Sequence, residues 1–182
     1  MTLPYLPSKV RAKSMGKILF AEQNGIYVLK FVGDVRLTLG PTISTFLDKL
    51  RNRENFRAMI IDMSETKAID STALGLVAKV GICCREQFAH TVSIISPNDD
   101  ITRVLKSMAM QDVCMISSDP LTEASDLAEL PREVASEDAL REQVLDAHRT
   151  LMSLNKDNQD KFKDLVEALE MEKLETPSRL AS

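Results

Sequence analysis

The chain has 182 residues, of which 44% are hydrophobic and 27% charged, a balance typical of a globular protein and not of a disordered or membrane-spanning chain. No run approaches the roughly eighteen apolar residues of a membrane helix, and residues 1–15 lack the apolar core of a secretion signal. We therefore expect a flexible N-terminal segment over residues 1–15 of a cytoplasmic protein. The net charge of −4 divides into +3 over residues 1–120 and −7 over residues 121–182, and neither part has the basic, aromatic-bearing face of a nucleic-acid binder.

The chain is expected to open with a β-hairpin. Residues 17–22 and 26–32 are rich in strand formers, and Asn24-Gly25 between them favours a type I′ turn. The pair Gly33-Asp34 then predicts the end of the second strand.

Apolar spacing predicts the elements that follow. In chain order they are a helix over 43–50 entered near residues 38–41, a buried strand over 58–63, a helix over 71–88, a strand over 91–95, a helix over 101–108, a strand over 113–116 and a short helix over 121–127. Strands that alternate with helices indicate an α/β fold with right-handed crossovers. We expect a mixed, mostly parallel sheet of four to five strands over residues 16–128.

Residues 129–182 are expected to form a linker and an acidic helical extension. Their apolar residues recur at helical spacing in two stripes: Leu140, Val144, Ala147, Leu151 and Leu154, then Phe162, Leu165, Val166 and Leu169. The stripes favour helices that lie on the domain or on a neighbour, and the alternative is a helix pair that docks a partner or forms a homodimer. The acidic polar faces argue against a membrane surface.

Catalytic and metal-binding signatures are scarce. Cys83, Cys84 and Cys114 have neither disulfide nor metal spacing and are expected to be small buried hydrophobes. His90 and His148 stand alone in the sequence, so no nucleophile–base pair is predicted. The carboxylates Asp62, Glu65 and Asp70 have no metal-loop spacing, and no glycine-rich phosphate loop occurs. We expect no enzyme activity, no metal and no cofactor.

Residues 61–75, IDMSETKAIDSTALG, run from the buried strand into the second helix. The part Asp70-Ser71-Thr72-Ala73-Leu74-Gly75 resembles the Asp-Ser-Ser/Thr-Gly/Ala-Leu-Gly motif of STAS domains in bacterial anti-sigma factor antagonists. The resemblance spans residues 16–127, includes the Gly33-Asp34 turn and leaves out the extension. It implies a STAS-like fold.

The resemblance also implies a partner switch. In this family the unmodified antagonist binds a kinase-like anti-sigma factor and so releases a sigma factor, the kinase phosphorylates the serine, and a phosphatase restores it. By position the phosphorylated residue is Ser71, and the partner surface comprises Gly33, Asp34, Arg36, Asp70, Ser71, Thr72, Leu74 and Gly75. Ala73 replaces the commoner glycine, and Arg36 stands where many members have an acidic residue, which bears on partner choice.

The residues themselves fit this role, because a serine at a helix N-terminus lies where backbone N–H groups and the helix dipole tolerate added negative charge. A simpler interpretation is that Asp70, Ser71 and Thr72 only cap the helix. Two further hypotheses remain: a STAS scaffold that binds a signalling enzyme through residues 129–182, and a sensor of a small ligand such as a lipid or nucleotide.

Overall fold

The computed structural model of the chain describes residues 15–120 and 126–175. The predictions for residues 1–14 and for most of the short helix over 121–127 therefore lie outside the described residues. The strands are β1 (Lys17–Gln23), β2 (Ile26–Val35), β3 (Ala58–Ile69), β4 (Val92–Ile95), β5 (Cys114–Ser117) and β6 (Ala128–Glu129). The helices are α1 (Gly40–Arg51), α2 (Ser71–Phe88), α3 (Asp99–Ser107), α4 (Glu137–Leu154) and α5 (Lys156–Glu175), with short 3-10 turns at Leu37–Leu39 and Met110–Asp112.

The fold is α/β, as predicted. Its sheet has the order β5-β4-β3-β2-β1-β6, in which β2, β3, β4 and β5 pair in parallel and β1 pairs antiparallel with β2 and β6. Asn24 and Gly25 both have positive φ, 53° and 79°, which is the geometry of the expected type I′ turn. The sheet has six described strands, because β6 adds one to the four or five expected.

Two strands are longer than the sequence suggested. β2 was expected to end at Gly33-Asp34, and β3 at residue 63, but the two strands continue side by side to Val35 and Ile69. Gly33 instead marks an irregularity: its φ is +76° and the β2–β3 register shifts beside it. A β-bulge allows the strand to continue where a glycine would otherwise end it, so both strands reach the start of α2.

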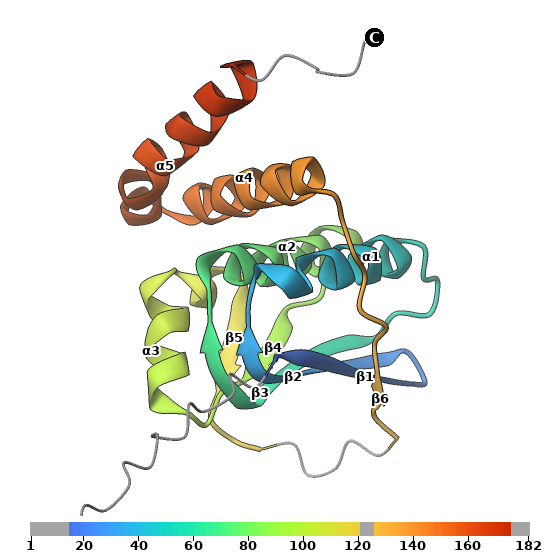
Figure 1. Ribbon diagram of the computed structural model, residues 1–182. Coiled ribbons are helices and arrows are strands. Elements are labelled where there is room, and N and C mark those ends of the chain that lie inside the picture. Colours follow the sequence, from blue (N-terminus) through green and yellow to red (C-terminus); the bar gives the residue numbers. More distant parts are fainter. Residues whose placement is uncertain (1–14, 121–125, 176–182) are drawn as a thin grey trace, which may run out of the picture.

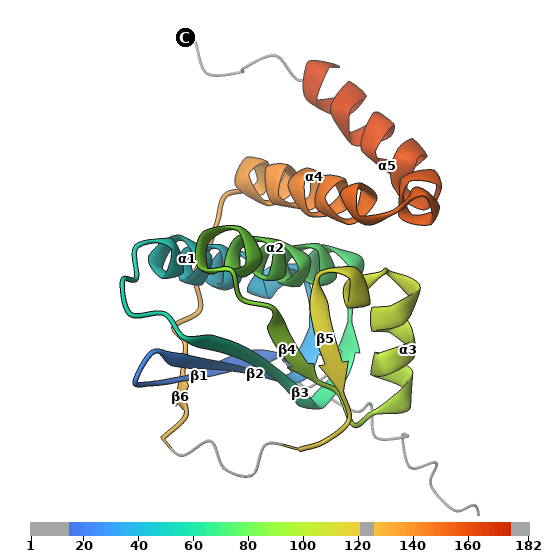
Figure 2. The same ribbon diagram turned by 180° about the vertical axis from the view of Figure 1, so that it is seen from behind.

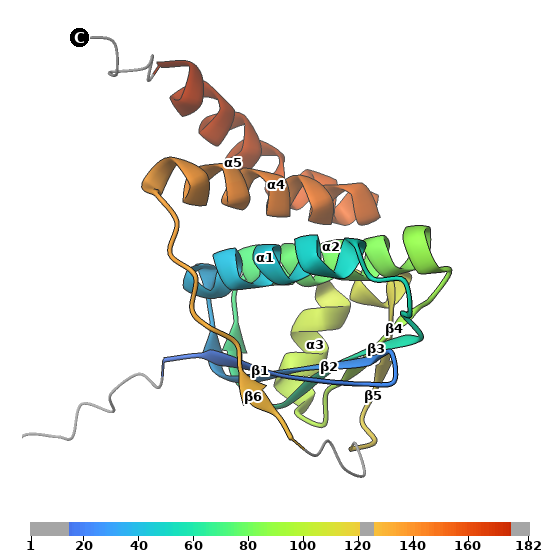
Figure 3. The same cartoon turned by 90° about the vertical axis from the view of Figure 1, so that its right-hand side faces the viewer.

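The helices form layers on the sheet. Figure 1 shows α1 and α2 side by side over one face of the sheet, and Figure 2 shows the same two layers from behind, with α3 beside β5. Figure 3 shows α4 as a further layer on α1 and α2. One hydrophobic core links them, since it includes Phe31 and Ile61 from the sheet, Val77 from α2 and Leu151 from α4.

The segment expected to be a linker is attached to the sheet. Ala128 and Glu129 pair with β1, and the N–H of Leu130 donates to the carbonyl oxygen of Ile18 at 2.9 Å. The guanidinium of Arg132 then donates to the carbonyl oxygen of Gly16 at 2.7 Å. The sheet edge therefore fixes the point from which the chain crosses to α4.

α4 and α5 form a helical hairpin that turns at Asn155. The side chain of Asn155 accepts a hydrogen bond from the N–H of Asn158 at 2.8 Å, so α5 begins at the next residue, Lys156. Within the described residues, no helix is long and apolar enough to cross a membrane.

Candidate functional site

The N-terminus of α2 is fixed by the side chain of Asp70. Oδ1 accepts a hydrogen bond from the N–H of Ala73 at 2.8 Å, which is an N-cap, and Oδ2 accepts one from the N–H of Leu37, also at 2.8 Å. The N–H of Asp70 itself donates to the carbonyl oxygen of Val35 at 3.1 Å. One carboxylate therefore joins the helix that starts at Ser71 to the loop that follows β2.

This junction brings together the two halves of the predicted partner surface. Gly33 and Asp34 pair with Thr66 and Ala68 at the end of the β2–β3 ladder, and Arg36 is exposed in the loop that Asp70 holds. The loop with Arg36 and the start of α2 thus form one continuous region, although they are more than thirty residues apart in sequence.

Ser71, the first residue of α2, is half-buried and bound to a histidine of the extension. Its Oγ lies 2.9 Å from Nε2 of His148 on α4. The sequence prediction that His148 is isolated is therefore wrong. His148 is almost fully buried, with 3% of its surface exposed, and its ring meets Phe162 of α5 edge to face at a centroid distance of 4.9 Å.

The second ring nitrogen of His148 determines the direction of the bond to Ser71. Nδ1 lies 2.7 Å from the carbonyl oxygen of Val144, which can only accept. Nδ1 therefore carries a proton, and in the neutral imidazole Nε2 accepts the hydrogen bond that the hydroxyl of Ser71 donates. Such a serine–histidine pair has the geometry by which a base draws a proton from a nucleophilic hydroxyl, with a backbone carbonyl as the orienting group.

The other predicted partner residues on α2 are buried. Thr72 is 6% exposed, Leu74 1%, and residues 72–78 are all buried, which means that α2 is enclosed on every side over two turns. At Gly75, an added Cβ atom would lie 2.3 Å from the carbonyl oxygen of Ala147 on α4. The glycine therefore permits close approach of the two helix backbones.

Polar contacts border this helix interface. Lys79 of α2 pairs with Asp146 of α4 at the partly exposed margin. On the α1 side, the amide Nε2 of Gln143 donates to Oγ of Ser44 at 2.8 Å. The hairpin is thus positioned from both sides over α1 and α2.

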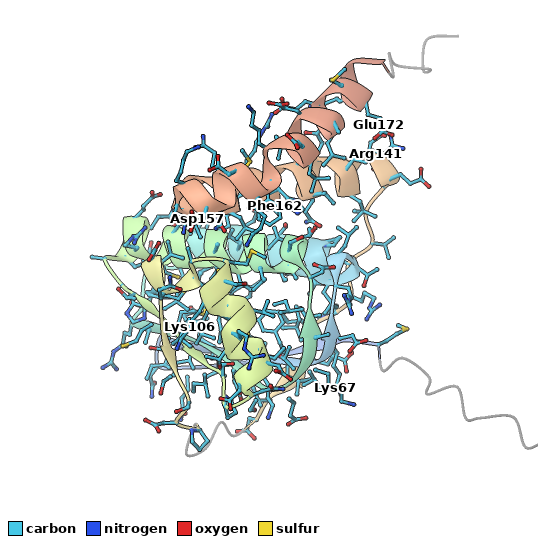
Figure 4. The ribbon with its side chains drawn as sticks, turned by 90° about the vertical axis from the view of Figure 1, so that its left-hand side faces the viewer. Lys67, Lys106, Arg141, Asp157, Phe162 and Glu172 are labelled. Atoms are coloured by element: carbon cyan, nitrogen blue, oxygen red, sulfur yellow. The ribbon has the colours of Figure 1, made fainter. Side chains whose placement is uncertain are left out.

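α5 fastens the hairpin at its turn. The buried Asn158 donates from Nδ2 to the carbonyl oxygens of Met108 and Leu151, at 2.9 and 3.0 Å, which ties the turn to the end of α3. Figure 4 shows Phe162 near this turn and Arg141 with Glu172 at the other end of the hairpin. Arg141 and Glu172 form an ion pair between α4 and α5 at 3.6 Å.

The carboxylates considered for metal binding are placed differently. Nζ of Lys30 lies 2.6 Å from Oε1 of Glu65 and 3.7 Å from Oδ2 of Asp62. The hydrogen bond to Glu65 raises the pKa of Lys30, against the opposing effect of burial. Asp62 and Glu65 thus neutralise a lysine, while Asp70 caps α2.

The cysteines are buried and free, as predicted. Burial raises the pKa of the thiols of Cys84 and Cys114 to about 12 each. His90 has a structural role, because its Nε2 accepts a hydrogen bond from the N–H of Met59 at 3.1 Å.

His148 is the residue at this site that sequence reasoning missed. It lies next to Ala147 in the apolar stripe of α4, so the stripe indicated a buried face but not the surface on which that face packs. A histidine placed inside such a stripe was the available signal, since a buried imidazole needs hydrogen-bond partners.

Searches with this chain found no matching family model and no curated relative.

Proposed function

We propose that this protein is a cytoplasmic anti-sigma factor antagonist of the STAS type, controlled by phosphorylation of Ser71. In this proposal the unphosphorylated chain binds a kinase-like anti-sigma factor and thereby releases a sigma factor. The kinase transfers phosphate to Ser71, and a phosphatase removes it. The protein is a binding module and has no enzyme activity of its own.

The observation that carries the proposal is the position of Ser71 at the first residue of α2, next to the loop that Asp70 holds. A phosphate there lies at the positive end of the helix dipole, so the domain fold tolerates it. A partner surface that fits a neutral hydroxyl would instead meet a charge of about −1.5 to −2. Burying that charge without a counter-charge costs several kcal/mol, and about 1.4 kcal/mol is tenfold in affinity.

The test is capture of the partner by tagged full-length variants from an extract of the protein's own cells. Ser71→Ala should retain a kinase-like protein, and Ser71→Asp should retain less, with partial release accepted because aspartate has one charge and not nearly two. Ser64→Ala, at an exposed serine on β3, is the matched control. Equal capture by the alanine and aspartate variants at position 71 would contradict the proposal.

A second function is favoured by the surface of α5, where Leu165 is 42% and Met171 61% exposed. In this alternative the domain is a STAS scaffold, and α5 docks onto a signalling enzyme outside sigma control. Replacing both residues with serine should then abolish capture of the main partner while Ser71→Asp leaves it unchanged. The first function predicts the reverse pattern.

A further inference from the structure

We infer that the α4–α5 hairpin is a displaceable cover over Ser71, which must leave α2 before Ser71 is phosphorylated or a partner binds this face. The inference rests on the proposed function, which makes Ser71 the phosphorylated residue. The contacts that support it involve the extension, which the family resemblance does not reach.

α4 occupies the surface of α2 that a partner would need. Residues 72–78 of α2 are buried around the whole helix, and the sheet covers only one side of it. The close approach of Ala147 at Gly75 leaves no room between the two helices for a third chain. A partner that contacts Gly75 therefore binds in place of α4, not beside it.

A phosphate on Ser71 would meet the side chain of His148. Oγ of Ser71 lies 2.9 Å from Nε2 of the buried His148, a distance that a direct hydrogen bond fills. A phosphoryl group on Oγ in this position would need the volume of the imidazole ring, which also contacts the ring of Phe162. With Oγ in this position, phosphoserine at position 71 and the closed hairpin therefore exclude each other.

The connection to the hairpin permits such a movement. The hydroxyl of Thr42 donates to the carbonyl oxygen of Pro131 and accepts from the N–H of Glu133, so the connection is held as far as Glu133, whereas the next residue, Val134, is 92% exposed. The contacts that hold the hairpin in place are the apolar side chains of Ala147 and Leu151, the bond between Ser71 and His148, the bonds of Gln143 to Ser44 and of Asn158 to Met108, and the half-exposed pair Lys79–Asp146. Exposed ion pairs contribute little, so the apolar contacts decide the balance.

The hairpin would consequently set the fraction of molecules that are open and able to bind a partner or receive phosphate. A partner that binds only the open form has its apparent affinity reduced by the open fraction. Phosphate on Ser71 holds the chain open, and an open, unphosphorylated chain is the form that captures the partner. Any ligand that prefers the open form raises the fraction of molecules in which Ser71 is accessible to a partner or to the kinase.

The experiment measures access to position 71 in the full-length chain without any partner. Ser71→Cys places a thiol there, and a maleimide coupled to polyethylene glycol of about 5 kDa is the probe. Cleavage after Lys67 and Lys79 yields a peptide of residues 68–79 that contains this cysteine and none of the native ones. The native Cys84 and Cys114 are buried in the domain core and report on unfolding in the same sample.

The hairpin is then loosened in the Ser71→Cys background. Leu151→Asp removes a fully buried apolar contact of α4, and the matched control Leu165→Asp makes the same change at an exposed position of α5. We expect labelling at position 71 to be at least about tenfold faster with Leu151→Asp and unchanged with Leu165→Asp, while Cys84 and Cys114 stay unlabelled. Equal labelling rates in all three proteins would overturn the inference.

A milder pair of variants controls for unfolding of the whole domain by Leu151→Asp. Asp146→Lys opposes Lys79 with a like charge at a partly exposed site, and Asp164→Lys makes the same change on the exposed side of α5. The first should accelerate labelling a few-fold and the second should not; equal rates for both would count against the cover.

The outcome also separates this inference from the proposed function. If labelling is slow in the parent and fast with Leu151→Asp, but native Ser71 is never phosphorylated, the result would support the cover and reject the phosphorylation switch. Fast labelling in the parent Ser71→Cys chain, together with phosphorylation of native Ser71, would reject the cover alone.

Discussion

Gly75 is the position where the docking of α4 can be tested with a single added carbon. A Cβ atom there would lie 2.3 Å from the carbonyl oxygen, 2.6 Å from the carbonyl carbon and 2.8 Å from Cα of Ala147. All three are backbone atoms, which no rotamer change moves aside. To bring the shortest of these contacts to 3.0 Å, α4 must recede by about 0.7 Å.

Two effects of Gly75→Ala oppose each other. Overpacking of this kind costs about 1–3 kcal/mol, and alanine gains up to about 1 kcal/mol over glycine inside a helix. The gain stabilises α2 whether or not the hairpin is docked, whereas the cost falls only on the docked form. The docked form therefore loses about 1–3 kcal/mol relative to the undocked form, or about fivefold or more in population.

Hydrogen exchange with mass spectrometry measures this change. Most of the stability of a helix in a protein comes from packing of its apolar face, so the amides of α4 exchange faster when the hairpin leaves α2. Gly75→Ala should speed exchange in residues 137–154 by about fivefold or more and leave β3 unchanged. Exchange of α4 that is unchanged or slower would refute the close helix contact.

Three further predictions concern other parts of the structure. His148→Ala removes both the bond to Ser71 and the ring contact with Phe162, and should speed exchange of α4 by about tenfold while β3 is unaffected. Ala89 ends α2 with φ of 51°, so Ala89→Gly should raise the free energy of unfolding by up to about 1 kcal/mol in urea titrations. The thiol pKa values of Cys84 and Cys114 rise on folding from 9.0 to about 12. The two buried neutral thiols therefore stabilise the folded state fully below pH 9, and this contribution is lost as the pH rises toward 12. Cys84→Ala should reduce the loss of folding stability at alkaline pH.

Most of the α/β domain could be predicted because its elements carry local signals. The Asn24-Gly25 turn has the residues that positive φ requires, and Asp70 before the apolar stripe of α2 is a helix cap readable from sequence. Gly33 misled the prediction because a glycine with positive φ fits both a strand end and a bulge. The pairing of β2 with β3 decides between a strand end and a bulge at Gly33, and this pairing joins residues that are far apart in the sequence.

The site was predicted in part for the same reason. Ser71 and Asp70 belong to a contiguous motif, whereas His148 lies 77 residues away and meets Ser71 only because α4 packs on α2. The stripe of apolar residues in α4 showed that one face is buried. Which surface covers this face of α4 depends on how closely two helices can approach, and here Gly75 of α2 allows close contact with Ala147. The spacing of apolar residues does not contain that information.

Site-resolved mass spectrometry determines whether Ser71 receives the phosphate. The full-length protein is incubated with ATP and an extract of its own cells, and the peptide of residues 68–79 is fragmented, since its two hydroxyl residues are Ser71 and Thr72. We expect one added phosphate on Ser71 and none anywhere on Ser71→Ala. Phosphate on Thr72 or elsewhere, or undiminished incorporation into Ser71→Ala, would contradict it.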